Sequence, residues 1–261
     1  MKLDKLIHKL HIVSVVALAT VALVWSGAVA ALATTVSIGE RNFEAVAPQG
    51  FVITGVYHPE IKRQFEAALP KGGRLVEFYL PSADFNVLHS GGVPKFDRVF
   101  QLQVLTATEN KLVSNAGFAD VATLMEKGLA KPPAGMTFLG TRAREPWGLF
   151  YALQLADGGT SGNTEVGAAV VVVNYQLLQL MYYVDSSLPH ARDEADAGVL
   201  AWARALREAN PDQQYLAERA GKLDLAGGNM SVDNAAFNIG RILGLACFGY
   251  IVYRLLRRRT N

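Results

Sequence analysis

Cysteine is almost absent from this sequence. Its 261 residues include a single cysteine, Cys247, close to the C-terminus. No disulfide can therefore form within the chain. The middle of the sequence also offers no thiol for catalysis or for a cysteine-based metal site.

Reaction motifs are missing as well. The sequence has no G-x-x-x-x-G-K phosphate loop, no G-x-G-x-x-G after a strand, no H-E-x-x-H and no G-x-S-x-G. Three histidines of the middle, His58, His89 and His190, are far apart in the sequence, and scattered loop histidines are usually plain surface residues. The sequence therefore predicts no catalytic, cofactor-binding or metal-ligating residue. A hydrolase that uses His89 or His190 stays open as an alternative.

Acidic residues are missing from the C-terminal end. Residues 235–261 contain five arginines and no Asp or Glu, which gives a net charge of +5. Residues 1–33 carry +2, whereas residues 34–234 carry −5. The overall charge of +2 thus belongs to the two ends, and the middle is mildly acidic. Because an acidic domain binds phosphate backbones poorly, nucleic acid is not an expected partner.

The N-terminal segment has the pattern of an export signal. Lysines precede a stretch, residues 12–33, that carries no charge over 22 positions. Two small-x-small patterns, 28–30 and 31–33, offer candidate signal-peptidase sites, which end with Ala30 and Ala33. Residues 1–33 are therefore predicted to be a signal peptide or an uncleaved membrane anchor. In both cases the lysines stay in the cytoplasm and the middle is exported.

The C-terminal end is predicted to anchor the exported domain. Residues 221–234 have the composition of a flexible linker, and residues 235–256 form an apolar stretch long enough to span a bilayer. Arg257 begins a basic cytoplasmic tail, residues 257–261, which matches the positive-inside rule. An amphipathic surface helix is the rival interpretation, but residues 242–253 lack a polar face.

Small residues recur inside this predicted span. Ala236, Gly240 and Gly244 are four residues apart and share one helical face, which would allow a second helix to approach closely. Glycine and alanine are also common in such helices without any packing role. Arg241 interrupts the stretch, and it needs a partner if it lies deep in the bilayer.

The middle of the chain, residues 34–220, alternates extended and helical patterns. Phe118, Val121, Met125 and Leu129 form a helical stripe, and Val199, Trp202, Ala203 and Leu206 form another. The expected helices cover residues 59–69, 115–129 and 192–210, with Asn115 as a cap. The start of the domain is expected to be extended from about residue 35 to residue 57. The expected strands cover residues 51–57, 74–81, 96–107, 137–143, 148–156, 166–175 and 177–186. This order predicts an α+β domain in which helices pack on an antiparallel sheet.

One predicted loop, residues 82–97, carries apolar side chains. Phe85, Val87 and Leu88 lie in it beside His89, and these four residues are the candidate contacts for a partner or ligand. The alternative is that the apolar side chains pack onto the edge of the sheet.

The order of elements resembles the Mog1/PsbP-like domains, which include exported members in bacteria. The resemblance covers about residues 43–210. It rests on the opening APQGFVI (46–53 region), the antiparallel meander and the closing Trp-bearing helix that ends in ANP (209–211). It implies an antiparallel sheet with packed helices and a binding role, because members mostly act as accessory or stability factors and share no catalytic residues.

These patterns lead to an expected function. We expect a non-enzymatic protein of the bacterial inner membrane, with its main domain in the periplasm and its C-terminus in the cytoplasm. Its expected partners are the lipid bilayer, a membrane protein or envelope complex, and a second copy through the C-terminal span. No cofactor is expected. Two alternatives stay open: a tethered periplasmic domain that binds a small ligand or lipid, and an envelope hydrolase with an unrecognised site.

Overall fold

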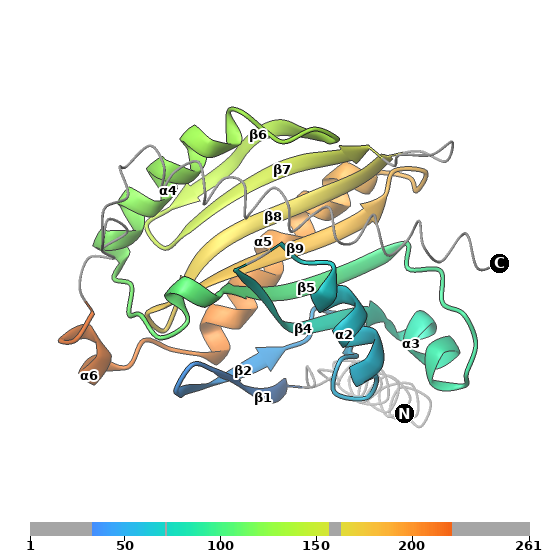
Figure 1. The fold of residues 1–261 in the computed structure, drawn as a ribbon, viewed down its shortest axis with the longest axis horizontal. Helices are drawn as coiled ribbons and strands as arrows, with labels where there is room; N and C mark the ends of the chain where they lie inside the picture. The colour runs from blue at the N-terminus through green and yellow to red at the C-terminus, as the bar shows by residue number, and fades with distance from the viewer. Residues whose placement is uncertain (1–32, 71, 157–162, 221–261) are drawn as a thin grey trace, which may run out of the picture. The chain divides into compact units, whose positions relative to one another are not determined.

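The computed structural model describes residues 33–70, 72–156 and 163–220, which all belong to one compact unit of the chain (Figure 1). The linker, the C-terminal span and the predicted signal or anchor lie outside these residues, except that the last residue of the predicted signal, Ala33, is described. Within the described ranges, no helix combines the length and the apolar character that a membrane crossing needs.

A seven-stranded antiparallel sheet forms the centre of the domain (Figure 1). Its last four strands form a meander in which each pairs with the next along the chain. In spatial order the strands are β3 (Phe51–Ile53), β4 (Gly73–Pro81), β5 (Arg98–Leu105), β9 (Gln176–Asp185), β8 (Asn163–Val173), β7 (Gly148–Ala156) and β6 (Met136–Glu145). The predicted α+β class and its antiparallel sheet with packed helices are confirmed.

Both faces of the sheet are covered, which explains why its central strands are apolar on both sides. One face packs against α2 (Pro59–Ala67) and α4 (Asn115–Leu129). The other face packs against α5 (Ala191–Ala209) and the strands β1 (Ala33–Ile38) and β2 (Arg41–Val46). All ten residues of β9 are consequently buried. Figure 1 shows α4 and α5 on opposite sides of the sheet.

The three predicted helices are confirmed, with one change at a cap. The apolar stripes of α4 and α5 are buried as their spacing predicts. The α4 cap, however, is Ser114 instead of Asn115, because the Ser114 side chain accepts a hydrogen bond from the Gly117 N–H. Three further helices complete the set in the described ranges: α3 (Ser82–His89), η1 (Thr106–Thr108) and α6 (Gln214–Ala217).

The start of the domain is a hairpin and not one extended stretch. Gly39 adopts φ +60° at the turn between β1 and β2, a conformation that glycine reaches without strain. Residues 54–57 leave the sheet after β3. The predicted strand over 51–57 is therefore wrong in its second half.

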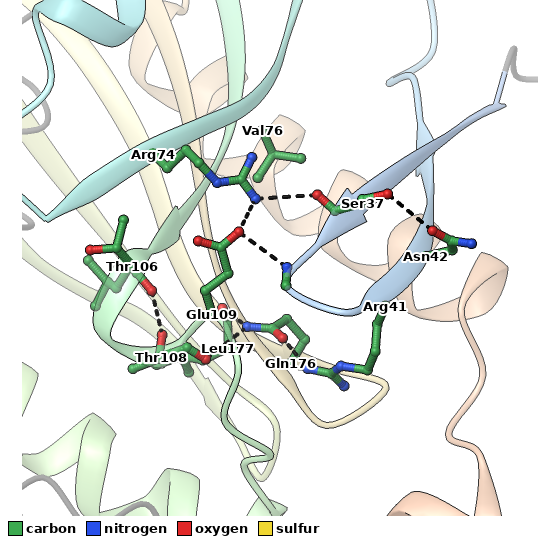
Figure 2. Close-up of polar contacts among 12 residues, drawn as sticks. Ser37, Arg41, Asn42, Arg74, Val76, Thr106, Thr108, Glu109, Gln176 and Leu177 are labelled. Atoms are coloured by element: carbon green, nitrogen blue, oxygen red, sulfur yellow. Dashed lines mark hydrogen bonds and ion pairs between the residues drawn. The ribbon is translucent and has the colours of Figure 1, made fainter.

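Side chains from other elements hold this hairpin against the sheet (Figure 2). Glu109 accepts hydrogen bonds from the Gly39 N–H at 3.2 Å and from Arg74 Nη2 at 2.5 Å. On the other side of the turn, Arg41 donates to the backbone oxygen of Asn174 and to the Gln176 side chain. The hairpin is thus fixed at its tip by contacts with two distant parts of the chain.

The closing helix α5 and the residue that follows it are hydrogen-bonded to β2. Trp202 Nε1 donates to the Val46 carbonyl at 2.8 Å. The Asn210 side chain accepts from the Glu44 N–H at 2.8 Å and donates to the Glu44 carbonyl at 2.9 Å, so it bonds β2 as a neighbouring strand would. The Trp-bearing helix and its terminal asparagine therefore lie against the strand that leads into the APQGFVI segment.

Candidate functional site

The segment after β4 is a helix where the sequence predicted a loop. This helix, α3 (Ser82–His89), contains no buried residue. Phe85 and Leu88 are partly buried and pack against the core, as the sheet-edge alternative predicted. Val87 points outward and is 40% exposed. The candidate contacts therefore divide between the core and the surface.

Two segments that are distant in the sequence meet at α3. Tyr57 and His58 follow β3, and their rings lie 5.5 and 5.9 Å from the Phe85 ring. His89 stacks on Phe85 with the ring centres 5.6 Å apart and an interplanar angle of 13°. The rings of His58 and His89 are 5.8 Å apart in an edge-to-face arrangement. The four rings form one connected aromatic cluster.

Exposed apolar side chains lie on the same segments of the chain as this cluster, or next to them. Five large apolar residues of the described ranges are exposed, and four of them lie on α3 or in the segments beside it. We call these four residues the docking patch: Val56 (54% exposed), Tyr57 (60%), Val87 (40%) and Val93 (62%). The fifth, Tyr215 on α6, is 61% exposed. Such a gathering of apolar side chains is typical of a contact surface.

The geometry of the backbone explains how the patch is assembled. The Gly92 N–H donates to the Val87 carbonyl at 2.8 Å, which brings Val93 back toward the end of α3. A Cβ atom on Gly92 would lie 2.9 Å from the Val87 side chain, so a glycine is needed for this close approach. Two parts of the patch are thus tied together by a local turn.

A buried carboxylate supports the other part of the patch. Glu77 on β4 is 1% exposed, and its Oε1 accepts from the Gly55 N–H at 2.7 Å and from the Phe78 N–H at 2.8 Å. A Cβ on Gly55 would lie 2.2 Å from that oxygen. Thr54 adds a second attachment, because its N–H donates to the Phe78 carbonyl at 2.9 Å. These bonds fix the turn that presents Val56 and Tyr57.

Burial raises the pKa of Glu77, and the ammonium group of Lys62 opposes this effect from 3.8 Å. Lys62 Nζ also donates to the Val76 carbonyl at 2.6 Å. Glu77 is closed to solvent and accepts two backbone N–H groups, so it holds the turn above it in place.

His190, the other candidate histidine, does not join this site. His190 lies at the start of α5, where it is exposed and 4.0 Å from Asp193. The Ser90 hydroxyl donates to the Val87 carbonyl at 2.9 Å, so it is engaged with the backbone of α3. Within residues 33–70, 72–156 and 163–220, no group of three or more His, Cys, Asp or Glu side chains is placed to hold a metal ion.

Three members of the patch were not predicted from the sequence: Val56, Tyr57 and Val93. The segment FVITGVY has the composition of a strand, so its last residues were expected in the sheet. Gly55 was the available signal for a turn, since it precedes the two exposed residues. The predicted packing residues Ala236, Gly240, Arg241 and Gly244 lie outside the described part of the chain.

Comparisons with known proteins give distant likenesses. No family model matches the chain, and no curated protein does. Among solved structures, it is similar to PA94 from Pseudomonas aeruginosa, a protein of unknown function, with 15% identity over 70% of this chain and 99% of that one and a TM-score of 0.29. It is also similar to PsbP (CyanoP) from Synechocystis sp. PCC 6803, with 12% identity over 70% of this chain and 94% of that one and a TM-score of 0.28. The second of these proteins is a PsbP, the kind of domain that the order of elements resembles.

Proposed function

We propose that this chain is a non-enzymatic accessory or assembly factor of the bacterial inner membrane, and that its exported domain binds a partner protein of the envelope through the docking patch. The observation that carries the proposal is the gathering of four of the five exposed large apolar residues of the described ranges around α3. Uncovered apolar surface of this kind gains free energy when another protein covers it.

The character of the patch favours a protein partner. Tyr57 combines a large apolar ring with a hydroxyl group, and such residues are enriched in the energetically important centres of interfaces. The turn below Tyr57 is fixed by Glu77 and Thr54, so the patch is already ordered before a partner binds. The resemblance to domains that mostly act as accessory factors points in the same direction. The apolar ends of the chain would keep the domain at the membrane.

In-cell photo-cross-linking tests the proposal. A photoreactive phenylalanine analogue replaces Tyr57 in the full chain, and a matched chain carries it at Tyr215, which is equally exposed (60% and 61%). We expect a discrete protein adduct from position 57 that is absent from position 215. The adduct at position 57 should disappear when Val87→Asp is added and persist when Tyr215→Asp is added. Adducts with lipid alone, or equal protein adducts at both positions, would contradict the proposal.

A further inference from the structure

The outer edge of β1 offers backbone groups of Thr35 that no described element binds. Strands β1 and β2 form a separate two-stranded sheet, in which Thr35 is paired with Glu44. The N–H and C=O groups of Glu44 both bind the Asn210 side chain, so they point away from β1. In an antiparallel pair, two directly opposite residues either both point their N–H and C=O groups toward each other or both point them away. The N–H and C=O groups of Thr35 therefore point away from β2.

The same alternation places Ala33 and Ser37 on the outer edge with Thr35. The Ser37 carbonyl accepts a hydrogen bond from Arg74 Nη2 at 3.3 Å, which confirms its outward direction (Figure 2). All three residues are exposed. Within the described ranges, the backbone groups of Thr35 have no hydrogen-bond partner. An exposed row of this kind is ready to accept another strand.

The other edges of the domain are protected against such pairing. The edge strand β6 is interrupted by two register shifts, between Phe138 and Gly140 and between Thr141 and Ala143. It also carries arginines that pair with α4 and α5. The opposite edge strand, β3, has three residues. By contrast, β1 pairs with β2 without a register shift and carries no charge, proline or glycine.

We propose that β1 pairs with β1 of a second copy of this chain, antiparallel and about a two-fold axis at Thr35. Thr35 would face Thr35 of the second copy, and Ala33 would face Ser37. A two-fold contact brings each side chain against itself or a near neighbour, so any charge on the strand would meet a like charge. The sequence ATTVSI has none. The pairing would form about four backbone hydrogen bonds and leave the Ser37 carbonyls with Arg74.

The hairpin is well suited to this contact because it is already held in place. Glu109 fixes its tip at Gly39, and Asn210 fixes β2 on the side away from β1. Little backbone freedom is therefore lost when a second hairpin is added. The result would be a four-stranded sheet across the two copies, separate from the docking patch and from the predicted contact through the C-terminal span.

Disulfide trapping in membranes tests this pairing on the full chain. Cys247→Ser removes the natural cysteine, and Thr35→Cys introduces a new one. Directly opposite residues of paired strands lie within disulfide distance. The matched control is Thr141→Cys in the same background, an exposed threonine on the protected edge strand β6. We expect roughly ten times more disulfide-linked dimer from position 35 than from position 141. Equal amounts from the two positions would overturn the proposal.

A second variant tests the backbone directly. Thr35→Pro removes an N–H that points away from β2, so the bonds between β1 and β2 are kept. We expect the full chain with Thr35→Pro, measured by mass in lipid nanodiscs, to lose the dimer. Thr35→Val keeps the N–H and should keep the dimer. A monomeric natural chain, or a Thr35→Pro chain as dimeric as the natural one, would contradict the proposal.

Discussion

The helices α5 and α3 both lie beside the sheet, but they use their apolar side chains in opposite ways. The 19-residue α5 buries six residues along one stripe, among them Trp202. The eight-residue α3 buries none, and it leaves Val87 in solvent. A covered apolar stripe stabilises the fold, whereas uncovered apolar groups are available to another molecule. We therefore expect the α5 side of the domain to carry the stability, and we propose the α3 side for binding.

The α5 side and the α3 side also differ in the pKa of a carboxylate. The Arg98 guanidinium binds the Glu194 carboxylate on α5 through two hydrogen bonds, of 2.6 and 2.9 Å, and thereby lowers the pKa of Glu194. Below the docking patch, burial raises the pKa of Glu77. The charged form is thus favoured on the α5 side and disfavoured under the patch.

The largest effect is expected from Trp202→Ala. This change leaves a cavity between α5 and the sheet and removes the hydrogen bond to the Val46 carbonyl. We expect a loss of about 3–5 kcal/mol in the free energy of unfolding. Urea unfolding of the full chain in mild detergent measures it, with Tyr215→Ala on the surface as the control. A loss below about 1 kcal/mol would show that α5 does not carry the stability assigned to it.

Glu77→Gln should change how stability depends on pH. Because the pKa of Glu77 is raised in the folded state, its stabilising contribution is present at low pH and is lost as the pH rises through that raised pKa. Glutamine keeps the acceptor for Gly55 and does not ionise. The variant should therefore gain stability relative to the natural chain as the pH rises from 4 to 8. Unfolding at both pH values measures the difference, and the exposed Glu60→Gln is the control.

Glu194→Gln should show the opposite dependence. The pKa of Glu194 is lowered in the folded state, so its contribution is present above the ordinary pKa of a glutamate and is lost as the pH falls through the lowered value. Since the side chain is partly exposed, we expect a loss of about 1 kcal/mol at pH 7 that shrinks toward pH 3. Asp193→Asn in the same turn, where the side chain is 86% exposed, should change little at either pH. A pH dependence with the same sign as that of Glu77→Gln would refute the contrast.

The sequence predicted those elements whose apolar residues recur with a single regular spacing. The helices α4 and α5 were recognisable because their apolar residues form single stripes. The helix α3 was missed because its apolar residues point in two directions: Phe85 and Leu88 toward the core, Val87 toward solvent. Such a helix has no stripe, and the glycines that follow it indicated a loop.

The candidate site was predicted only in part, and for a different reason. Phe85 and His89 were identified within one segment of the sequence. Their neighbours Tyr57 and His58 come from another segment, and this contact depends on the pairing of β3 with β4. A long-range contact of this kind leaves no local pattern in a single sequence. The turn at Gly55 was detectable, but the carboxylate that binds it was not.

The smallest change in stability should produce the clearest change in binding. Val87→Asp places a charge on an exposed position of α3, so the free energy of unfolding should change by no more than about 0.5 kcal/mol. The same charge should prevent apolar contact with a partner. The decisive measurement is capture of the partner identified at Tyr57 by the Val87→Asp chain, beside a Tyr215→Asp chain of matched stability. We predict that Val87→Asp loses the partner and Tyr215→Asp keeps it; full capture by Val87→Asp would contradict the assignment of binding to the α3 side.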